Sequence, residues 1–344
     1  MKGAIYNGVQ DVKLHEWPMP TCGPKDVIIQ NKRAGICGTD IHAYTIEGDS
    51  VGIMPGNQFG HEMVGEVYEV GAEVSGVEKG MRVFVDPNKR MPLGKGLNAT
   101  EIADMAGAFS EFVLVEEAEM GYNLFELPEG LSYDKAVLTE PLAVAMHGVN
   151  IANPSAGQKA IIYGGGIIGL AAIAALQSKG ITEIIVTDIV PSRLAMAREL
   201  GAIPFNGREG NVSEFAMETW GADTDAMGLK TTKADIVIDC GGYAGVMEDF
   251  IAHAKSGSQL SVVALSGTPE KVVPYMLVAK EINLLGSRGY QAPDILQVLE
   301  TLNRPECKLD KIITDQFPLT SIEEAFIVAS DKEKQIKVIV NHEG

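Results

Sequence analysis

The chain has 344 residues, of which 46% are apolar, so it is long for one hydrophobic core and suits two domains. Its 28 basic and 46 acidic residues give a formal net charge of −18, which argues against general binding to nucleic acid phosphates. No basic amphipathic stretch or apolar run of bilayer length favours a membrane partner.

The first residues, Met1 to Tyr6, lack the apolar core of a signal peptide, so we expect a soluble cytoplasmic protein. The four cysteines are scattered and form no CxxC motif, which excludes a disulfide framework in a chain this long.

Short apolar segments separated by Gly and Pro fill the first ~150 residues. This texture predicts a β-rich, barrel-like unit. We expect strands at residues 2–6, 26–34, 62–70, 81–85 and 110–115, and the first long helix at 133–150.

Strands alternate with helices after about Gly157, a pattern typical of a parallel sheet in an α/β domain. We expect strands at 159–163, 183–187, 235–240 and 259–265, with helices at 169–179, 191–200 and 245–254. A helix at 292–303, a segment at 312–317 and a strand at 335–341 follow, and we expect this tail to return to the first domain. The predicted divisions are therefore 1–150, 151–285 and 286–344.

A glycine-rich turn lies between the strand at 159–163 and the helix that follows it. Gly164, Gly166 and Gly169 have the GxGxxG spacing, with Ile167 and Ile168 between the last two. The first Gly permits the turn, the second permits close approach of a pyrophosphate, and the third permits helix–sheet packing. The pattern predicts a dinucleotide site at the helix N-terminus.

Asp188 stands at the end of the next strand, where a carboxylate binds ribose hydroxyls and repels a 2′-phosphate. We therefore expect NAD rather than NADP. Three further cofactor contacts are predicted: Arg193 on the adenosine side, the backbone around Leu265 at a strand end, and Arg288 near the domain return.

Cys37 and His61 are candidate zinc ligands. A catalytic zinc takes three protein ligands from Cys, His and carboxylate and keeps one position open. Glu62 and Glu140 compete for the third ligand position, and the sequence leaves that choice open. Asp40 is a candidate acceptor for the ring N–H of His61.

These motifs together resemble a known family. Gly60-His61-Glu62-x-x-Gly65-x5-Gly71-x-x-Val74 matches the zinc signature of the medium-chain alcohol dehydrogenases, and residues 35–42 resemble the segment carrying that family's first ligand. The order continues through Glu140-Pro141, the glycine turn and Asp188, so the resemblance covers nearly the whole chain. It looks closest to the polyol branch, which includes sorbitol, threonine and butanediol dehydrogenases.

The resemblance implies an α/β protein with a GroES-like β-rich catalytic domain and a Rossmann domain with a doubly wound parallel sheet. It implies that Thr39 and His42 relay the substrate proton, and that Glu140 acts at the metal. Many relatives carry a second, structural zinc on four cysteines, but residues 86–108 contain no Cys. We therefore expect one catalytic zinc in each chain.

The implied activity is hydride transfer between NAD and a secondary alcohol such as a polyol or sugar alcohol. Two alternatives stay open: a reductase working in reverse on a sugar phosphate or hydroxy amino acid derivative, and a non-catalytic dinucleotide-binding relative. The substrate is a small molecule, and the resemblance implies a homodimer or homotetramer, with the strand at 282–286 as the candidate pairing edge.

Overall fold

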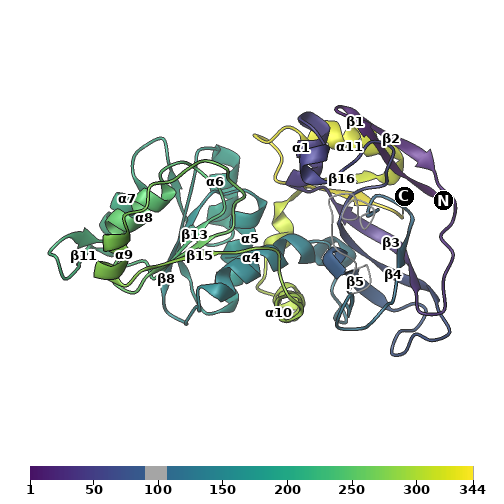
Figure 1. Cartoon of the computed structure of the whole chain (residues 1–344), viewed down its shortest axis with the longest axis horizontal. Helices are drawn as coiled ribbons and strands as arrows, with labels where there is room; N and C mark the ends of the chain where they lie inside the picture. Colours follow the sequence, from purple (N-terminus) through teal and green to yellow (C-terminus); the bar gives the residue numbers. More distant parts are fainter. Residues whose placement is uncertain (90–106, 344) are drawn as a thin grey trace. The chain divides into compact units, whose positions relative to one another are not determined.

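The computed structural model describes residues 1–89 and 107–343 (Figure 1). The chain forms two compact units. Unit 1 comprises Met1–Glu140, Leu302–Arg304 and Asp310–Gly344, and unit 2 comprises Pro141–Thr301 and Pro305–Leu309. The chain passes from unit 1 into unit 2 at Pro141 and returns to unit 1 after Thr301, whereas the sequence analysis placed the divisions at 150 and 285. Each unit is described by itself.

Unit 1 is built on a mostly antiparallel sheet with the order β16-β17-β3-β4-β5-β7, and β6 also pairs with β3. Its strands are β3 (Val27–Gly35), β4 (Glu62–Val70), β5 (Arg82–Val85), β6 (Phe112–Val115), β7 (Leu124–Glu126), β16 (Ile313–Pro318) and β17 (Lys337–Asn341). A hairpin of β1 (Lys2–Gly8) and β2 (Asp11–Glu16) accompanies this sheet.

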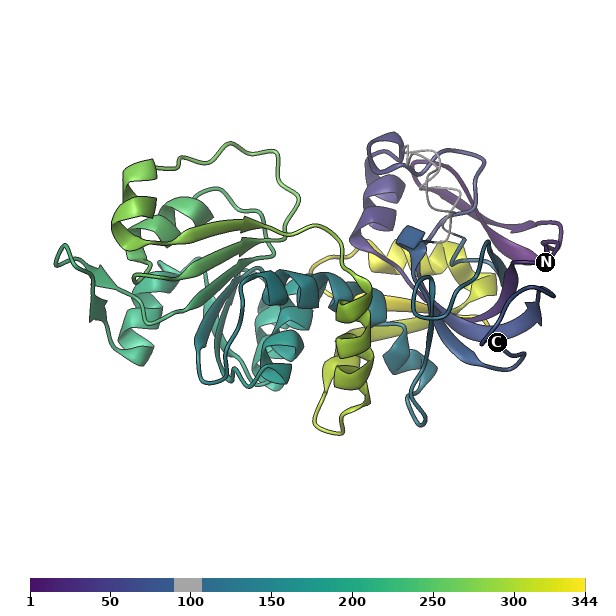
Figure 2. The same ribbon diagram turned by 60° about the horizontal axis from the view of Figure 1, so that its bottom comes forward.

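The C-terminal segment of unit 1 packs against its N-terminal part, as the sequence analysis expected of the tail. Helix α11 (Ile322–Ala329) contacts β2, and β17 pairs antiparallel with β3, so the yellow and purple segments lie side by side (Figures 1 and 2). Three buried aromatic rings, Phe59, Phe109 and Phe326, lie 5.0–5.6 Å from one another. This aromatic core fixes the loop that leads into β4.

The remaining elements of unit 1 are short. They are α1 (Gly38–Thr45), α3 (Tyr133–Ala136), η1 (Asp49–Val51), η2 (Pro87–Lys89), η3 (Leu309–Ile312, shared between the units) and η4 (Leu319–Ser321).

Unit 2 contains a parallel sheet with the order β10-β9-β8-β13-β14-β15. Its strands are β8 (Lys159–Tyr163), β9 (Glu183–Asp188), β10 (Ile203–Asn206), β13 (Ile236–Asp239), β14 (Gln259–Val262) and β15 (Asn283–Gly286). A small hairpin of β11 (Asp223–Thr224) and β12 (Lys230–Thr231) projects beside them.

Helices follow the strands of unit 2 in alternation, which makes the sheet doubly wound. Helix α5 packs on β8 and on α6, whereas buried residues of α7 and α8 form a core with β8, β9, β13 and β14. The helices are α4 (Thr139–Ile151, which begins in unit 1), α5 (Ile167–Ser178), α6 (Pro191–Glu199), α7 (Val212–Trp220), α8 (Val246–His253), α9 (Pro274–Lys280) and α10 (Ala292–Asn303). Strand order reverses between β8 and β13, and ligands of such sheets bind at the carboxyl ends of the strands on either side of this point.

The structure differs from the expected elements in several places. The predicted helix at 133–150 is two helices, α3 and α4, and the strand expected to reach residue 265 ends at Val262. The sequence analysis missed β2, α1, α7 and α11, among other elements. The missed helices α1, α7 and α11 have eight or nine residues, and helices of the same length, α6 and α8, were predicted because they follow strands in the alternating part of the chain. Among the described residues, no helix has the length and apolarity needed to cross a bilayer.

Candidate active site

Two strands of unit 1 bring the predicted metal ligands together. β3 pairs antiparallel with β4 so that Gly35 lies opposite Glu62. Cys37 follows the end of β3, and His61 immediately precedes β4. This register places the thiol next to the imidazole although the two residues are far apart in the sequence.

Cys37, His61 and Glu62 form a potential metal site. One ligand atom from each lies within 4.8 Å of the others, and no other such group of three occurs within residues 1–89 and 107–343. The Cys37 thiol also donates to the Thr39 hydroxyl at 3.7 Å. Thiolate, imidazole and carboxylate match the donor set of a catalytic zinc site.

Asp40 lies behind these ligands in the first turn of α1. Its Oδ2 accepts a hydrogen bond from the Cys37 amide at 2.9 Å, which fixes the start of the helix. Its Oδ1 is buried without a hydrogen-bond partner among the described residues and lies 3.9 Å from His61 Nδ1. Burial raises the pKa of Asp40 to about 6. An acceptor in this position orients a ligating imidazole.

The side chains around His61 favour a positive charge at this site. Burial alone lowers the pKa of His61, but the adjacent Cys37 and Asp40 raise it well above its ordinary value. A divalent cation bound to a neutral imidazole and a thiolate would supply that positive charge, so the residues present fit zinc.

Glu140 and Glu62 have different surroundings. Glu62 is buried and forms an ion pair with the equally buried Lys337, whose ammonium also donates to the Ile36 carbonyl at 3.0 Å. Glu140, in the first turn of α4, is close enough for the charges of His61 and Glu62 to act on it, and burial raises its pKa to about 7. Glu140 does not belong to the 4.8 Å group within the described chain. Either carboxylate could therefore serve as the third metal ligand. Of the two, Glu62 is the one that forms an ion pair with a lysine.

The sequence analysis missed Lys337. It is the first residue of a strand otherwise composed of apolar residues and Asn341, and its side chain is 0% exposed. A lysine at a buried strand position was the only signal in the sequence, and it did not identify the partner.

His42 lies on α1 and is partly exposed. Its Nε2 lies 3.3 Å from the Ser50 hydroxyl. Thr39 and His42 therefore occupy the same short helix, one near the thiol and the other near solvent. The structure described shows both positions but no bond between them.

The glycine turn of unit 2 has the geometry expected for phosphate binding. Gly164 has φ +95°, and a Cβ on Gly169 would collide with the Gly164 carbonyl. Gly166 caps the N-terminus of α5, and no atom lies within 4 Å of the position where its Cβ would be. The turn is thus tight where it packs and open where a ligand would approach. Ile167 and Ile168 form the partly buried first turn of α5.

Asp188 ends β9 next to this turn. Its carboxylate accepts hydrogen bonds from the amides of Gly165 at 2.7 Å, Ile189 at 2.7 Å and Val190 at 2.9 Å. Arg193 Nη1 lies 3.6 Å from the same carboxylate. The other two predicted cofactor contacts are exposed: Leu265 in the loop after β14 and Arg288 after β15.

Most of the stretch expected to have lost a structural zinc, residues 90–106, lies outside the described residues. The structure therefore does not bear on that expectation.

Comparison with known proteins identifies the family. The model "Alcohol dehydrogenase GroES-like domain" matches residues 23–129, and "Zinc-binding dehydrogenase" matches residues 168–304. The chain is 31% identical to (R,R)-butanediol dehydrogenase of Bacillus subtilis, covering 99% of both proteins. It is 28% identical to sorbitol dehydrogenase of the same species, covering 99% of this chain and 97% of that one.

A crystal structure of the Bacillus subtilis 2R,3R-butanediol dehydrogenase superposes with a TM-score of 0.84 at 29% identity and covers 99% of both chains. The predicted GroES-like and Rossmann architecture is confirmed, as is an oxidoreductase of the alcohol dehydrogenase type, and zinc and NAD agree with the family. The chain belongs to the zinc-dependent medium-chain alcohol dehydrogenases, in their polyol branch.

Proposed function

We propose that this protein transfers hydride between NAD and a secondary alcohol such as a polyol or sugar alcohol. The observation that carries the proposal is the group of Cys37, His61 and Glu62, with the unpartnered Asp40 oxygen beside it. Relatives over the full length are named for butanediol and sorbitol, both of which carry secondary hydroxyls.

Cys37 and His61 would hold the zinc, with Glu62 or Glu140 as the third protein ligand. Glu62 is favoured because its atoms lie within the group, whereas Glu140 would then act beside the metal as an exchanging base. Zinc, when bound, supplies a Lewis acid that lowers the pKa of a substrate hydroxyl. Lys337 bonds to one oxygen of Glu62 and holds it in place.

Thr39 and His42 would carry the proton released from the alcohol. A Thr hydroxyl both accepts and donates, and His titrates near neutral pH. Thr39 lies at the Cys37 thiol, and the partly exposed His42 can deliver the proton to solvent with Ser50 fixing its ring.

The cofactor would be held by unit 2. Its pyrophosphate would lie over Gly164, Gly166, Ile167, Ile168 and Gly169, and Asp188 would bind the ribose hydroxyls. Arg193 would contact the adenosine side, and the backbone at Leu265 and the side chain of Arg288 would contact the remainder. In this proposal residues 151–285, together with Arg288, hold the cofactor, and residues 1–150 with the rest of 286–344 carry the metal chemistry.

NADH absorbance tests the activity. Zinc-loaded protein is mixed with NAD and a panel of polyols, sugar acids, sugar phosphates and hydroxy amino acids, beside chelated protein and NADP controls. We expect chelator-sensitive, NAD-selective turnover, and the Cys37→Ser variant should lose both zinc and turnover. Turnover that survives complete removal of zinc would overturn the proposal.

The reductase alternative is tested by the same assay in reverse, with NADH and the corresponding ketone. Binding of NADH and zinc without turnover in either direction would favour the non-catalytic alternative.

We also propose a cytoplasmic homo-oligomer. Strand β15 is the last strand of its sheet, and Tyr275 and Val278 on the adjacent α9 are 68% and 78% exposed, which suits a subunit interface.

A further inference from the structure

Helix α4 carries a residue of the candidate metal site at its start and a set of polar anchors in its second half. Glu140 lies in the first turn, and His147 follows seven residues later on the same helix. Seven residues make almost two full turns, so the two side chains lie on one face of α4, about 10 Å apart along its axis. Whatever fixes the rotation of α4 at His147 therefore also fixes the direction in which Glu140 points.

Asp294, in the first turn of α10, binds the second half of α4. Its Oδ2 lies 2.9 Å from His147 Nδ1 and accepts a hydrogen bond from the Gln291 amide at 2.8 Å. Its Oδ1 accepts from Asn150 Nδ2 at 2.6 Å. A carboxylate only accepts, so His147 donates from Nδ1. Asp294 is buried, and little water can therefore replace a hydrogen bond that is lost there.

Gln297, one turn further along α10, extends these anchors. Its Oε1 accepts from Asn150 Nδ2 at 3.2 Å and also from Lys179, the residue that follows α5. Hydrogen bonds thus join α4 and α10 to the end of the helix that begins at the glycine turn. All of these residues belong to unit 2.

The apolar packing of α4 does less to define its rotation. A Cβ on Gly148 would lie 2.6 Å from the Val263 side chain, so α4 approaches the end of β14 directly at that level. Other buried contacts are made by small or flexible side chains, among them Ala143, Ala145 and Met146. Burial of such side chains is favourable but not directional, whereas a hydrogen bond requires a defined angle.

Glu140 depends on a defined position. It is 8% exposed, and the charges of His61 and Glu62 act on its carboxyl group, although it lies outside the 4.8 Å group of potential ligands in the described chain. A carboxylate that acts beside a metal has to approach it within a narrow range of distance and angle. A misplacement of about 1 Å at a reacting centre can lower a rate roughly a hundredfold.

We infer that His147, through its hydrogen bond to Asp294, positions Glu140 for its role at the metal. The inference rests on the proposed function, because it assumes that Glu140 acts there. His147 is a positioning residue, and its effect passes along α4 to Glu140. A histidine that only stabilised unit 2 would change the unfolding temperature and leave metal affinity and turnover as they are.

A double-mutant cycle of His147→Leu and Glu140→Gln tests the inference. Zinc affinity is measured by competition with a chelator, and kcat with NAD and the best alcohol of the panel. Each single variant should lower both quantities, by roughly 10- to 100-fold for Glu140→Gln and by no more than that for His147→Leu. The double variant should lose no more than Glu140→Gln alone, because both substitutions remove the same contribution.

Two further variants probe the hydrogen bond itself. His147→Asn places an amide nitrogen where Nδ1 was and should restore most of the zinc affinity and kcat. Asp294→Asn replaces one acceptor oxygen by a donor and should reproduce the effect of His147→Leu, so it serves as a second test if His147→Leu does not fold. Circular dichroism checks the folding of each variant.

His253→Leu is the matched control. It removes a contact of the same length, 2.9 Å from His253 Nδ1 to Asp249 Oδ1, within α8. This variant should unfold at a lower temperature and keep wild-type zinc affinity and kcat.

Three outcomes would count against these expectations. Wild-type zinc affinity and kcat in a folded His147→Leu would overturn the inference and leave the proposed function intact. Losses that multiply in the double variant would also overturn it, because His147 would then act independently of Glu140. A Glu140→Gln variant with unchanged zinc affinity and kcat would instead overturn the proposed role of Glu140, and the inference with it.

Discussion

Lys337 and Glu62 form an ion pair with side chains 0% and 1% exposed, directly beside the proposed metal ligands. A charge left alone in such a place costs far more than the pair contributes, because water no longer solvates it. Gly35 belongs to this arrangement, since a Cβ there would overlap a Glu62 oxygen and lie 2.8 Å from Lys337 Nζ. The backbone, the carboxylate and the ammonium thus constrain one another.

Lys337→Met should lower the free energy of unfolding by about 3–5 kcal/mol, because Glu62 is left buried and unpaired. The double variant Glu62→Leu/Lys337→Met should recover most of that loss. Denaturant unfolding of both single variants and the double variant measures the coupling. Lys334→Met, at a surface lysine 79% exposed, is the control and should be unchanged. A loss as small as the control's would contradict a structural role for the pair.

Asp188 should decide the cofactor at the level of a single carboxylate. Asp188→Ser removes the charge that repels a 2′-phosphate, so kcat/KM for NADP relative to NAD should rise at least about tenfold, or about 1.4 kcal/mol. Steady-state kinetics with both cofactors measures the ratio. Glu183→Gln, at the other end of β9, should leave the ratio unchanged. A ratio unaffected by Asp188→Ser would show that another group selects the cofactor.

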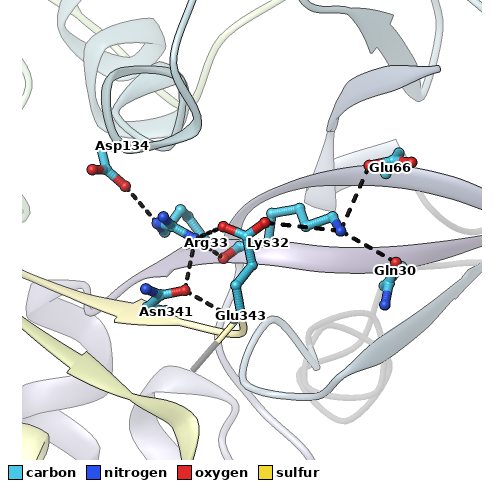
Figure 3. Close-up of polar contacts among 7 residues, drawn as sticks. All are labelled: Gln30, Lys32, Arg33, Glu66, Asp134, Asn341 and Glu343. Atoms are coloured by element: carbon cyan, nitrogen blue, oxygen red, sulfur yellow. Dashed lines mark hydrogen bonds and ion pairs between the residues drawn. The ribbon is translucent and has the colours of Figure 1, made fainter. Parts of the chain in front are cut away.

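At the scale of elements, the end of the chain is attached to unit 1 through Arg33 on β3. Its guanidinium bonds to Asp134, Asn341 and Glu343, while Lys32 on the same strand reaches Gln30 and Glu66 (Figure 3). The Arg33 side chain is mostly buried, so its hydrogen bonds are screened less than those of an exposed pair. These bonds tie α3 and the residues after β17 to the central strand.

Arg33→Ala should lower the free energy of unfolding by about 1.5–3 kcal/mol, the usual contribution of a hydrogen bond to a charged group. Limited proteolysis should then cut the C-terminal segment sooner than in the wild type. Lys13→Ala removes an exposed pair with Glu323 and serves as the control. Identical proteolysis of both variants would contradict the anchoring role.

A mostly buried carboxylate connects three elements of unit 2. Asp249 on α8 accepts hydrogen bonds from Tyr163, Asn211, Ser213 and His253. Burial alone would raise the pKa of Asp249, but these donors lower it to about 2. The hydrogen bond to Asp249 raises the pKa of His253 above 6.5. The charged pair is therefore favoured in the folded state, with Glu214 as a further nearby charge.

The pH dependence of this pair has a definite sign. The raised pKa of His253 contributes stability that is complete below about pH 6.5 and is lost as the pH rises through the folded value. The thermal unfolding temperature of the wild type should therefore exceed that of His253→Gln most at pH 5–6, and the difference should shrink toward pH 9. The depressed pKa of Asp249 acts only at the acid end, between about 4 and 2. A difference that grows with pH would contradict the assignment.

At the scale of the whole molecule, we proposed that two copies of the chain pair through the sheet edge of unit 2. This pairing predicts a dimer or tetramer that persists when the protein is diluted. Val278→Lys places a charge on the exposed apolar surface of α9 and should shift the protein toward a smaller species. Light scattering after gel filtration measures the mass. Ile327→Lys, on an exposed position of α11 in unit 1, is the control. A monomeric wild type would exclude the proposed assembly.

The sequence by itself determined the parts that depend on local spacing. The glycine turn needs only a strand before it, a helix after it and an acid at the next strand end, so Gly164, Gly166, Gly169 and Asp188 were identified without a structure. The zinc signature indicated Cys37 and His61 as candidate ligands in the same way. Both motifs are short, and their chemistry dictates the residue types.

Tertiary structure alone decided which distant residues meet. The register that places Gly35 opposite Glu62 brings the thiol to the imidazole, and the return of β17 places Lys337 beside Glu62 across 275 residues of sequence. Pairing between strands that are far apart in the chain leaves no pattern in the local sequence. The residues on either side of each partner are those of any buried strand or loop.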